Sequence, residues 1–339
     1  MRIGMVCFAT ERGLGYLAKS FYDNRIVTDA VVIHHGRIPT HTEWYPGCLE
    51  IGSLRDRGQQ MQMEQFCADM DVMLFFETVF HWPLIQACRD AGTLSILMPM
   101  YECTPHPLPL VPDKFICPSS LDMRYYPDNS KFIPVPVDVP WESRLKAHTF
   151  AHSAGYIGLN GRNGTLEVMQ AMRHVKNQID MLIRAQTDEL NQVIDKCPDI
   201  RDDPRVTIQI GHVPYEELRQ GIDVCVAPEL FNGLSLPLQE ARANGQLVIS
   251  VNRTPANEYI PEESLVTPTG FEQTKAHGRA RTMSKAIIDP KDLAAMIDKW
   301  YGQELGNYSL SGKYWAEDMS WESLGPLYME TIEEWRKEI

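Results

Sequence analysis

Short β-branched or aliphatic runs alternate with longer amphipathic stretches along most of this 339-residue chain. Parallel strands need crossover connections, and helices on both faces of a sheet leave its strands apolar throughout. The alternation therefore predicts an α/β protein built on parallel sheets. The expected strands are residues 2–8, 25–33, 72–76, 94–98, 114–117, 132–135, 155–159, 181–184, 206–210, 224–227 and 247–251. The expected helices include residues 15–22, 59–68, 166–172, 293–300 and 321–337.

The length of the chain and its 44% hydrophobic content are enough for two domains with separate cores. The proline-rich passage 133–140 predicts an extended connector, because proline without a regular pattern disfavours a helix. We therefore expect a first domain over 1–140 and a second over 141–320. Residues 321–339 form a third segment, which is expected to be a terminal helix.

Net charge is −13 and the sequence pI is about 5.2, which argues against a surface that is basic all over. A local basic groove remains compatible with that charge, since steering depends on local charge. The apolar runs are too short to span a bilayer, and the N-terminal run lacks a small-residue cleavage site. Eight cysteines without a Cys-x-x-Cys pair indicate reduced thiols. We expect a cytoplasmic protein without a transmembrane segment.

The segment 228–240, Pro-Glu-Leu-Phe-Asn-Gly-Leu-Ser-Leu-Pro-Leu-Gln-Glu, carries the clearest functional pattern. It joins a strand-like run to a helix-like run, and Gly233 allows the backbone to approach a ligand. Unpaired amides and the helix dipole there favour a diphosphate. Glu240, about one turn further on, has the acceptor oxygens for two adjacent sugar hydroxyls. An ordinary strand–turn–helix, whose Glu complements the positive helix end, is the alternative.

This segment resembles the donor-binding signature of retaining glycosyltransferases of family four, which have the two-Rossmann-domain architecture called GT-B. That signature places a first Glu before a Gly and a second Glu eight residues later. Asn232 stands where the family has its first Glu. The matching positions are Gly233, Leu236, Pro237, Glu240, Ala241, Gly245 and the strand 247–251. The resemblance implies two Rossmann-like domains facing across a cleft, with the 321–337 helix crossing back to the first domain.

The resemblance implies a donor site for a nucleoside-diphosphate sugar, with UDP or GDP as the expected nucleotide. Glu240 would hold the ribose and Asn232 the sugar, while backbone amides and Arg162 would hold the diphosphate. Asn163 stands where the family has a Lys, and Arg184 is a candidate replacement for that charge. Other donor-binding candidates are Gly13 and Gly15 in the first glycine-rich loop and Gly233, Leu234, Ser235 and Leu236 in the signature.

The acceptor is expected at the carboxyl ends of the first domain's strands, where ligands of open parallel sheets collect. Glu77, Tyr101 and Glu102 each follow a predicted strand, and His106 is close in sequence. Glu102 is the candidate for orienting or deprotonating an acceptor hydroxyl, with capping of the following turn as the alternative. The candidate catalytic residues are therefore Glu102, Arg162 and Asn232.

The segment 275–285 departs from the acidic trend, because it carries four formal positive charges and a His. A solvated loop is one interpretation. The other is a clamp for a phosphate-bearing acceptor through Arg279 and Arg281, including hydroxymethylated DNA as in some viral enzymes of this architecture.

The expected function is a retaining glycosyltransferase that moves a sugar from the nucleotide to the hydroxyl of a glycan, lipid or small molecule. Neither an Asp-x-Asp pair nor zinc-ligand spacing occurs, so we expect no metal and no cofactor beside the nucleotide sugar. Because Asn replaces both Glu at position 232 and Lys at position 163, an inactive nucleotide-sugar-binding protein is a further alternative. An epimerase of the same fold is another, without a feature that favours it.

Overall fold

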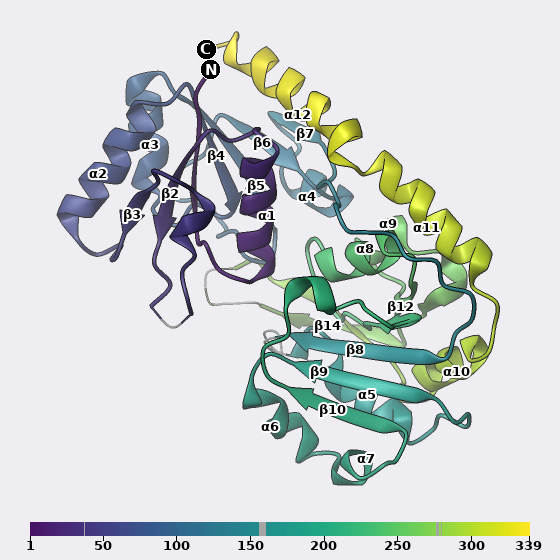
Figure 1. Ribbon diagram of the computed structural model, residues 1–339. Coiled ribbons are helices and arrows are strands. Elements are labelled where there is room, and N and C mark those ends of the chain that lie inside the picture. The colour runs from purple at the N-terminus through teal and green to yellow at the C-terminus, as the bar shows by residue number, and fades with distance from the viewer. Residues whose placement is uncertain (37, 156–160, 276–277, 279) are drawn as a thin grey trace. The chain divides into compact units, whose positions relative to one another are not determined.

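The computed structural model describes the chain except residues 37, 156–160, 276, 277 and 279 (Figure 1). The chain divides into two compact units. The first unit contains Met1–Pro136 and Met319–Ile339, with a short stretch that ends at Arg281. The second unit contains Val137–Ala276 and Thr282–Asp318. The division between the units therefore falls within the proline-rich passage.

The first unit contains a seven-stranded, all-parallel sheet in the order β3-β2-β1-β4-β5-β6-β7. The expected strand at 132–135 is wrong, because the last strand ends at Phe132 and Pro134 has no N–H to continue the ladder. The short β3 was not expected. The strands are β1 Ile3–Cys7, β2 Asp29–Ile33, β3 Leu49–Ile51, β4 Val72–Glu77, β5 Leu94–Pro99, β6 Lys114–Cys117 and β7 Ser130–Phe132.

Helices cover both faces of this sheet, and β4 shows how one strand serves both. Consecutive side chains of a strand point to opposite faces. Phe75 packs into the cluster under α2 and α3, which lie side by side in Figure 1, whereas Phe76 meets Phe21 of α1 edge-on at 4.9 Å. Both faces are thus buried, as the apolar strand pattern predicts. The helices are α1 Gly13–Asp23, α2 Arg57–Ala68, α3 Pro83–Ala91 and α4 Ser120–Tyr125.

The C-terminal helix α12, Trp321–Arg336, packs on the first unit. Trp321 Nε1 donates a hydrogen bond to Ser20 Oγ at 2.7 Å. Tyr328 is fully buried, and its hydroxyl donates to the Pro134 carbonyl at 3.0 Å. The ring of Tyr328 also meets Phe21 edge-on at 5.0 Å. The expected terminal helix is therefore present and covers the α1 face.

The second unit contains a six-stranded parallel sheet in the order β10-β9-β8-β11-β12-β13. Its strands are β8 Thr149–Gly155, β9 Asp180–Ala185, β10 Val206–Ile210, β11 Val224–Val226, β12 Leu247–Val251 and β13 Leu265–Val266. Its helices are α5 Thr165–Met172, α6 Asn191–Ile194, α7 Pro198–Arg201, α8 Leu236–Ala243, α9 Ala256–Tyr259, α10 Pro290–Trp300 and α11 Gly306–Asp318.

The first strand of this sheet differs from the prediction at 155–159. It spans Thr149–Gly155, whereas residues 156–160 lie outside the described part of the chain. The sequence of this strand looks polar, and for that reason the strand was not predicted. His152 is nevertheless completely buried in it, as are Phe150 and Ala154.

The basic segment is not a loop over its whole length. β14 Gly270–Thr274 and β15 Met283–Ile287 form an antiparallel pair, so residues 283–285 of the expected loop belong to a strand. No helix among the described residues is long and apolar enough to cross a membrane.

Candidate functional site

The turn between β11 and α8 has an unusual backbone at Ser235. This residue has φ 58° and ψ 48°, the left-handed conformation, and it occupies the N-cap position of α8. Left-handed backbone is costly for a residue with a side chain, so something must hold it. Ser235 is 1% exposed, and its hydroxyl donates a hydrogen bond to Glu229 Oε2. The side chain of Glu229 therefore fixes the entry to α8.

Glu229 itself is buried at 5% exposure. Asn232 Nδ2 donates to the same Oε2 at 2.9 Å, so one oxygen accepts from the middle and from the end of the turn. Burial raises the pKa of Glu229, and the hydroxyl of Ser235 and the charge of Arg162 oppose that rise. Glu229 was not among the expected site residues, because sequence alone did not show that the turn folds back onto its own start.

The carbonyl groups of the turn are held from outside it. Gln239 Nε2 donates to the Leu234 carbonyl at 2.8 Å. The Ala286 amide of β15 donates to the Leu230 carbonyl, also at 2.8 Å. The Leu230 amide in turn donates to the Arg162 carbonyl at 2.7 Å. The turn is therefore fixed to β15 and to the loop that carries Arg162.

The loop before α5 lies directly against this turn. Gly164 has φ +68°, and a Cβ on it would come within 2.3 Å of the Pro228 carbonyl oxygen. Asn163 Nδ2 donates to the Ala154 carbonyl at 2.8 Å, which closes the loop over the end of β8. Asn163 thus has a structural contact at the position where a Lys was expected. Arg162 is half-buried beside the turn, and residues 156–160 before it lie outside the described part of the chain.

Glu240 lies on α8 and has two protein partners. Tyr215 Oη donates to Oε1 at 2.7 Å, and the Arg219 guanidinium donates to Oε2 at 3.1 Å. The guanidinium also lies over the Tyr215 ring, 4.4 Å from its centroid. Burial raises the pKa of Glu240, and the Arg219 charge opposes the rise. Each carboxylate oxygen can accept a second hydrogen bond, so ribose hydroxyls are compatible with these partners.

Arg184 lies on β9, where its guanidinium is already engaged. Its Nε donates to Gln209 Oε1 at 2.9 Å, and a terminal nitrogen donates to the Leu218 carbonyl at 2.9 Å. Burial lowers the pKa of Arg184. Leu218 precedes Arg219, so Arg184 supports the segment that contacts Glu240. Tyr215 and Arg219 had no sequence signal, since they reach Glu240 from a separate stretch of chain.

In the first unit, the expected glycines have different environments. Gly13 is exposed at the first residue of α1. A Cβ on Gly15 would lie 1.9 Å from the Thr10 carbonyl oxygen. The loop's own fold therefore requires glycine at position 15, whether or not a ligand approaches it.

The expected acceptor residues lie at the carboxyl ends of β4 and β5. Tyr101 stacks on Tyr125 with centroids 5.5 Å apart and planes 7° apart. The Arg281 guanidinium lies 4.6 Å from the Tyr125 ring centroid and 5.3 Å from that of Tyr126. The structure thus brings Tyr101 and Arg281 onto one aromatic stack.

The remaining acceptor candidates lie around that end of the sheet. Glu77 ends β4 with φ 65°, and its carbonyl accepts from Thr104 Oγ1 at 2.7 Å. Glu102 is 1% exposed in the turn after β5, whereas His106 is exposed. Arg279 lies outside the described residues.

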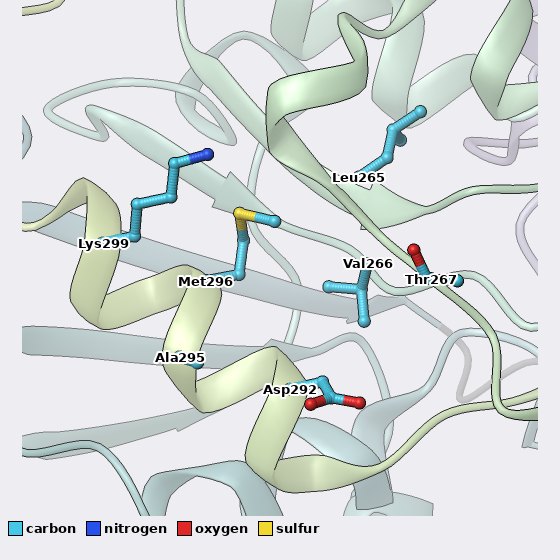
Figure 2. A pocket seen from close by; sticks show the side chains of 7 residues that line it. All are labelled: Leu265, Val266, Thr267, Asp292, Ala295, Met296 and Lys299. Atoms are coloured by element: carbon cyan, nitrogen blue, oxygen red, sulfur yellow. The ribbon is translucent and has the colours of Figure 1, made fainter.

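A pocket of about 380 Å³ lies elsewhere in the second unit, between β13 and α10 (Figure 2). Asp292 and Lys299 of α10 give it charge, and Val266 and Met296 give it apolar surface. None of the expected site residues lines it. Within the described chain, no group of three or more His, Cys, Asp or Glu side chains has a metal-binding arrangement.

No protein-family model matches the sequence, and no curated protein does. Solved structures do match. HepE of Anabaena in complex with UDP and glucose has 12% identity and a TM-score of 0.74, over 98% of this chain and 100% of that one. Sucrose-phosphate synthase of Thermosynechococcus elongatus has 12% identity and a TM-score of 0.69, over 99% and 98%. A glycosyltransferase of Rickettsia africae has 13% identity and a TM-score of 0.64, over 99% and 98%. The expected GT-B fold is confirmed.

Proposed function

We propose that this protein is a glycosyltransferase that transfers a sugar from a nucleoside-diphosphate sugar to an acceptor hydroxyl with retention of configuration. The observation that carries the proposal is the turn 228–235 leading into α8, with Glu240 one turn inside the helix. Structures of HepE with UDP and with UDP-glucose share the fold, which favours a UDP-sugar as donor. Retention rests on the resemblance of the signature to family four.

The roles of the donor side follow from charge. The leaving group is a nucleoside diphosphate, whose negative charge must be stabilised as the sugar–oxygen bond breaks. The backbone amides of residues 233–236 and the dipole of α8 supply positive potential, and Arg162 supplies a full charge beside the turn. Glu240, held by Tyr215 and Arg219, accepts hydrogen bonds from the ribose hydroxyls. Asn232 contacts the sugar.

The acceptor side belongs to the first unit in this proposal. Glu102 accepts the proton of the attacking hydroxyl, and the stack of Tyr101, Tyr125 and Arg281 binds the acceptor. The reaction is proposed to need no metal and no further cofactor. All eight cysteines are free, which fits a reducing, cytoplasmic compartment.

A panel of UDP, GDP and their sugar conjugates, measured by thermal shift and calorimetry, tests the donor assignment. Specific ligands raise the apparent stability by mass action. Hydrolysis of the bound conjugate, followed by NMR of the released anomer, tests activity and retention. Affinity without any turnover would leave the alternative of a nucleotide-sugar-binding protein, which Asn163 and Asn232 motivate. Absence of affinity for the whole panel contradicts the proposal.

A second acceptor class is motivated by Arg281. Its guanidinium lies on Tyr125 and Tyr126, an arrangement that favours flat or anionic ligands. Hydroxymethylated pyrimidines in DNA are therefore the alternative to a glycan, lipid or small molecule. DNA binding is compared between the wild type and a variant with Arg279→Gln and Arg281→Gln. Lack of binding by the wild type, or equal binding by both, excludes DNA.

A further inference from the structure

The carboxylate near the start of α8 comes from position 229 rather than position 232. Asn232 has a neutral side chain, and Glu229 stands three residues before it. Glu229 Oε2 accepts from Asn232 Nδ2 at 2.9 Å and also from the Ser235 hydroxyl. The acidic group therefore contacts both the residue expected at the sugar and the residue that opens the helix.

The surroundings of Glu229 offset part of the cost of its burial. An uncompensated charge in a buried position is expensive. Two hydrogen bonds reach Oε2, and the charges of Arg162 and Arg253 favour the ionised form. Within the described part of the chain, Oε1 accepts no hydrogen bond from the protein. That oxygen therefore keeps the capacity to accept a hydrogen bond from a hydroxyl.

Glu229 also decides how the Asn232 amide lies. The two ends of a carboxamide differ, because the nitrogen only donates and the oxygen only accepts. Since Oε2 of Glu229 must accept, Asn232 presents its nitrogen to Glu229 and its oxygen elsewhere. The Leu234 amide approaches that oxygen at 3.4 Å. A reversed carboxamide would place two acceptors together and lose both contacts.

We infer that Glu229 is a positioning residue for the sugar end of the donor site. It orients the Asn232 amide, holds Ser235 in its left-handed conformation, and places at position 229 the negative group that position 232 lacks. This inference rests on the proposed function, and its substrate is the sugar portion of a nucleoside-diphosphate sugar.

Glu229→Gln is the main test, because Gln keeps the size and one acceptor oxygen while removing the charge. The tightest sugar conjugate of the panel and its bare nucleoside diphosphate are titrated into wild type and variant. We expect the affinity for the bare diphosphate to change less than threefold. We expect the affinity for the conjugate, or kcat for its hydrolysis, to fall at least tenfold. Glu262→Gln, an exposed Glu of the same unit, is the matched control and should change neither.

A relocation variant separates positioning from simple support of the fold. Glu229→Ser removes the carboxylate, and Glu229→Ser with Asn232→Glu returns one to the same turn. We expect the kcat of the double variant to be at least threefold higher than the kcat of the Glu229→Ser variant. A purely structural role predicts no recovery, since the contact to Ser235 is missing in both.

The outcomes are distinguishable. A wild type without affinity for any conjugate contradicts the proposed function itself. A wild type that binds the conjugate, with a Glu229→Gln variant of equal affinity and kcat, overturns the inference alone. Equal losses for the diphosphate and its conjugate also overturn it, because they show that Glu229 only maintains the turn.

Discussion

The Arg219 guanidinium donates to Glu240 Oε2 at 3.1 Å, and the side chains of the two residues are only 10% and 16% exposed. An ion pair in this environment is sensitive to the removal of either partner, because the other is left buried and unpaired. Glu240 is therefore both a proposed ribose ligand and one half of a structural pair.

This dual role shapes the expected effect of Glu240→Ala. The substitution should lower the free energy of unfolding by about 3 kcal/mol, as for a broken buried pair, and should also weaken nucleotide binding severely. Glu240→Gln keeps an acceptor for Tyr215 and is the better probe of binding. Urea unfolding and calorimetry with UDP measure the two effects separately. Unchanged UDP affinity in both variants would remove the ribose role.

Arg219→Met should make nucleotide affinity depend more strongly on pH. Without the Arg219 charge, the pKa of Glu240, already raised by burial, rises further. The protonated carboxyl accepts fewer hydrogen bonds from ribose, so affinity should increase from pH 6 to pH 8. The UDP dissociation constant at pH 6 divided by that at pH 8 should be larger in the variant than in the wild type. Equal ratios contradict the coupling.

His152 should make the protein less stable in mild acid. Its Nδ1 donates to the Val226 carbonyl and its Nε2 accepts from Thr165 Oγ1, each at 2.8 Å. Burial lowers the pKa of His152 from 6.5 to about 4. Above pH 6.5 the residue is neutral in both states and costs nothing. As pH falls below 6.5, the unfolded state gains the proton first, so stability is lost until about pH 4.

Between pH 7.5 and pH 5.5, this histidine should lower the free energy of unfolding by about 1.4 kcal/mol, because pH 5.5 is about one unit below the pKa of His152 in the unfolded chain. Urea unfolding of the wild type and of His152→Asn at both pH values gives the contribution by difference. The Asn variant should lack this part of the pH dependence. An equal dependence in both proteins means that His152 is not responsible.

Gly164→Ala and Gly161→Ala form a matched pair. Both glycines have left-handed backbone, with φ +68° and φ +69°. A Cβ at 164 would lie 2.3 Å from the Pro228 carbonyl oxygen, whereas a Cβ at 161 would meet no atom of the described residues within 4 Å. Gly161→Ala should cost about 1 kcal/mol of stability from backbone strain alone. Gly164→Ala should cost at least twice that and should weaken UDP binding. Equal costs in thermal unfolding contradict close packing of the two loops.

The sequence predicted the parallel sheets and the β11–α8 turn because both depend on local pattern. Gly233 and Pro237 mark the turn, and the apolar runs mark the strands. β8 was placed too late because a buried His is compatible with a core only when partners such as Val226 and Thr165 satisfy it. Those partners are not visible from the strand itself.

The partners of the site residues were the part that sequence did not predict. Glu229 reaches Ser235 only because the turn closes on itself. Arg219 reaches Glu240 of α8 from a separate segment of the second unit. Such contacts depend on tertiary geometry, which no spacing rule gives. Asn163 is a further example. The family has a charged Lys at this position, whereas Asn163 donates a hydrogen bond to the Ala154 carbonyl, which the sequence did not predict.

The return of α12 onto the first unit has a consequence for how the chain is made. The β-strands of that unit emerge from the ribosome early, but Trp321 and Tyr328, which cover Phe21, emerge only after the whole second unit. During synthesis the α1 face of the first sheet therefore remains uncovered, whereas the second unit can already fold. A nascent chain stalled before residue 321 should therefore need chaperones for the first unit and not for the second.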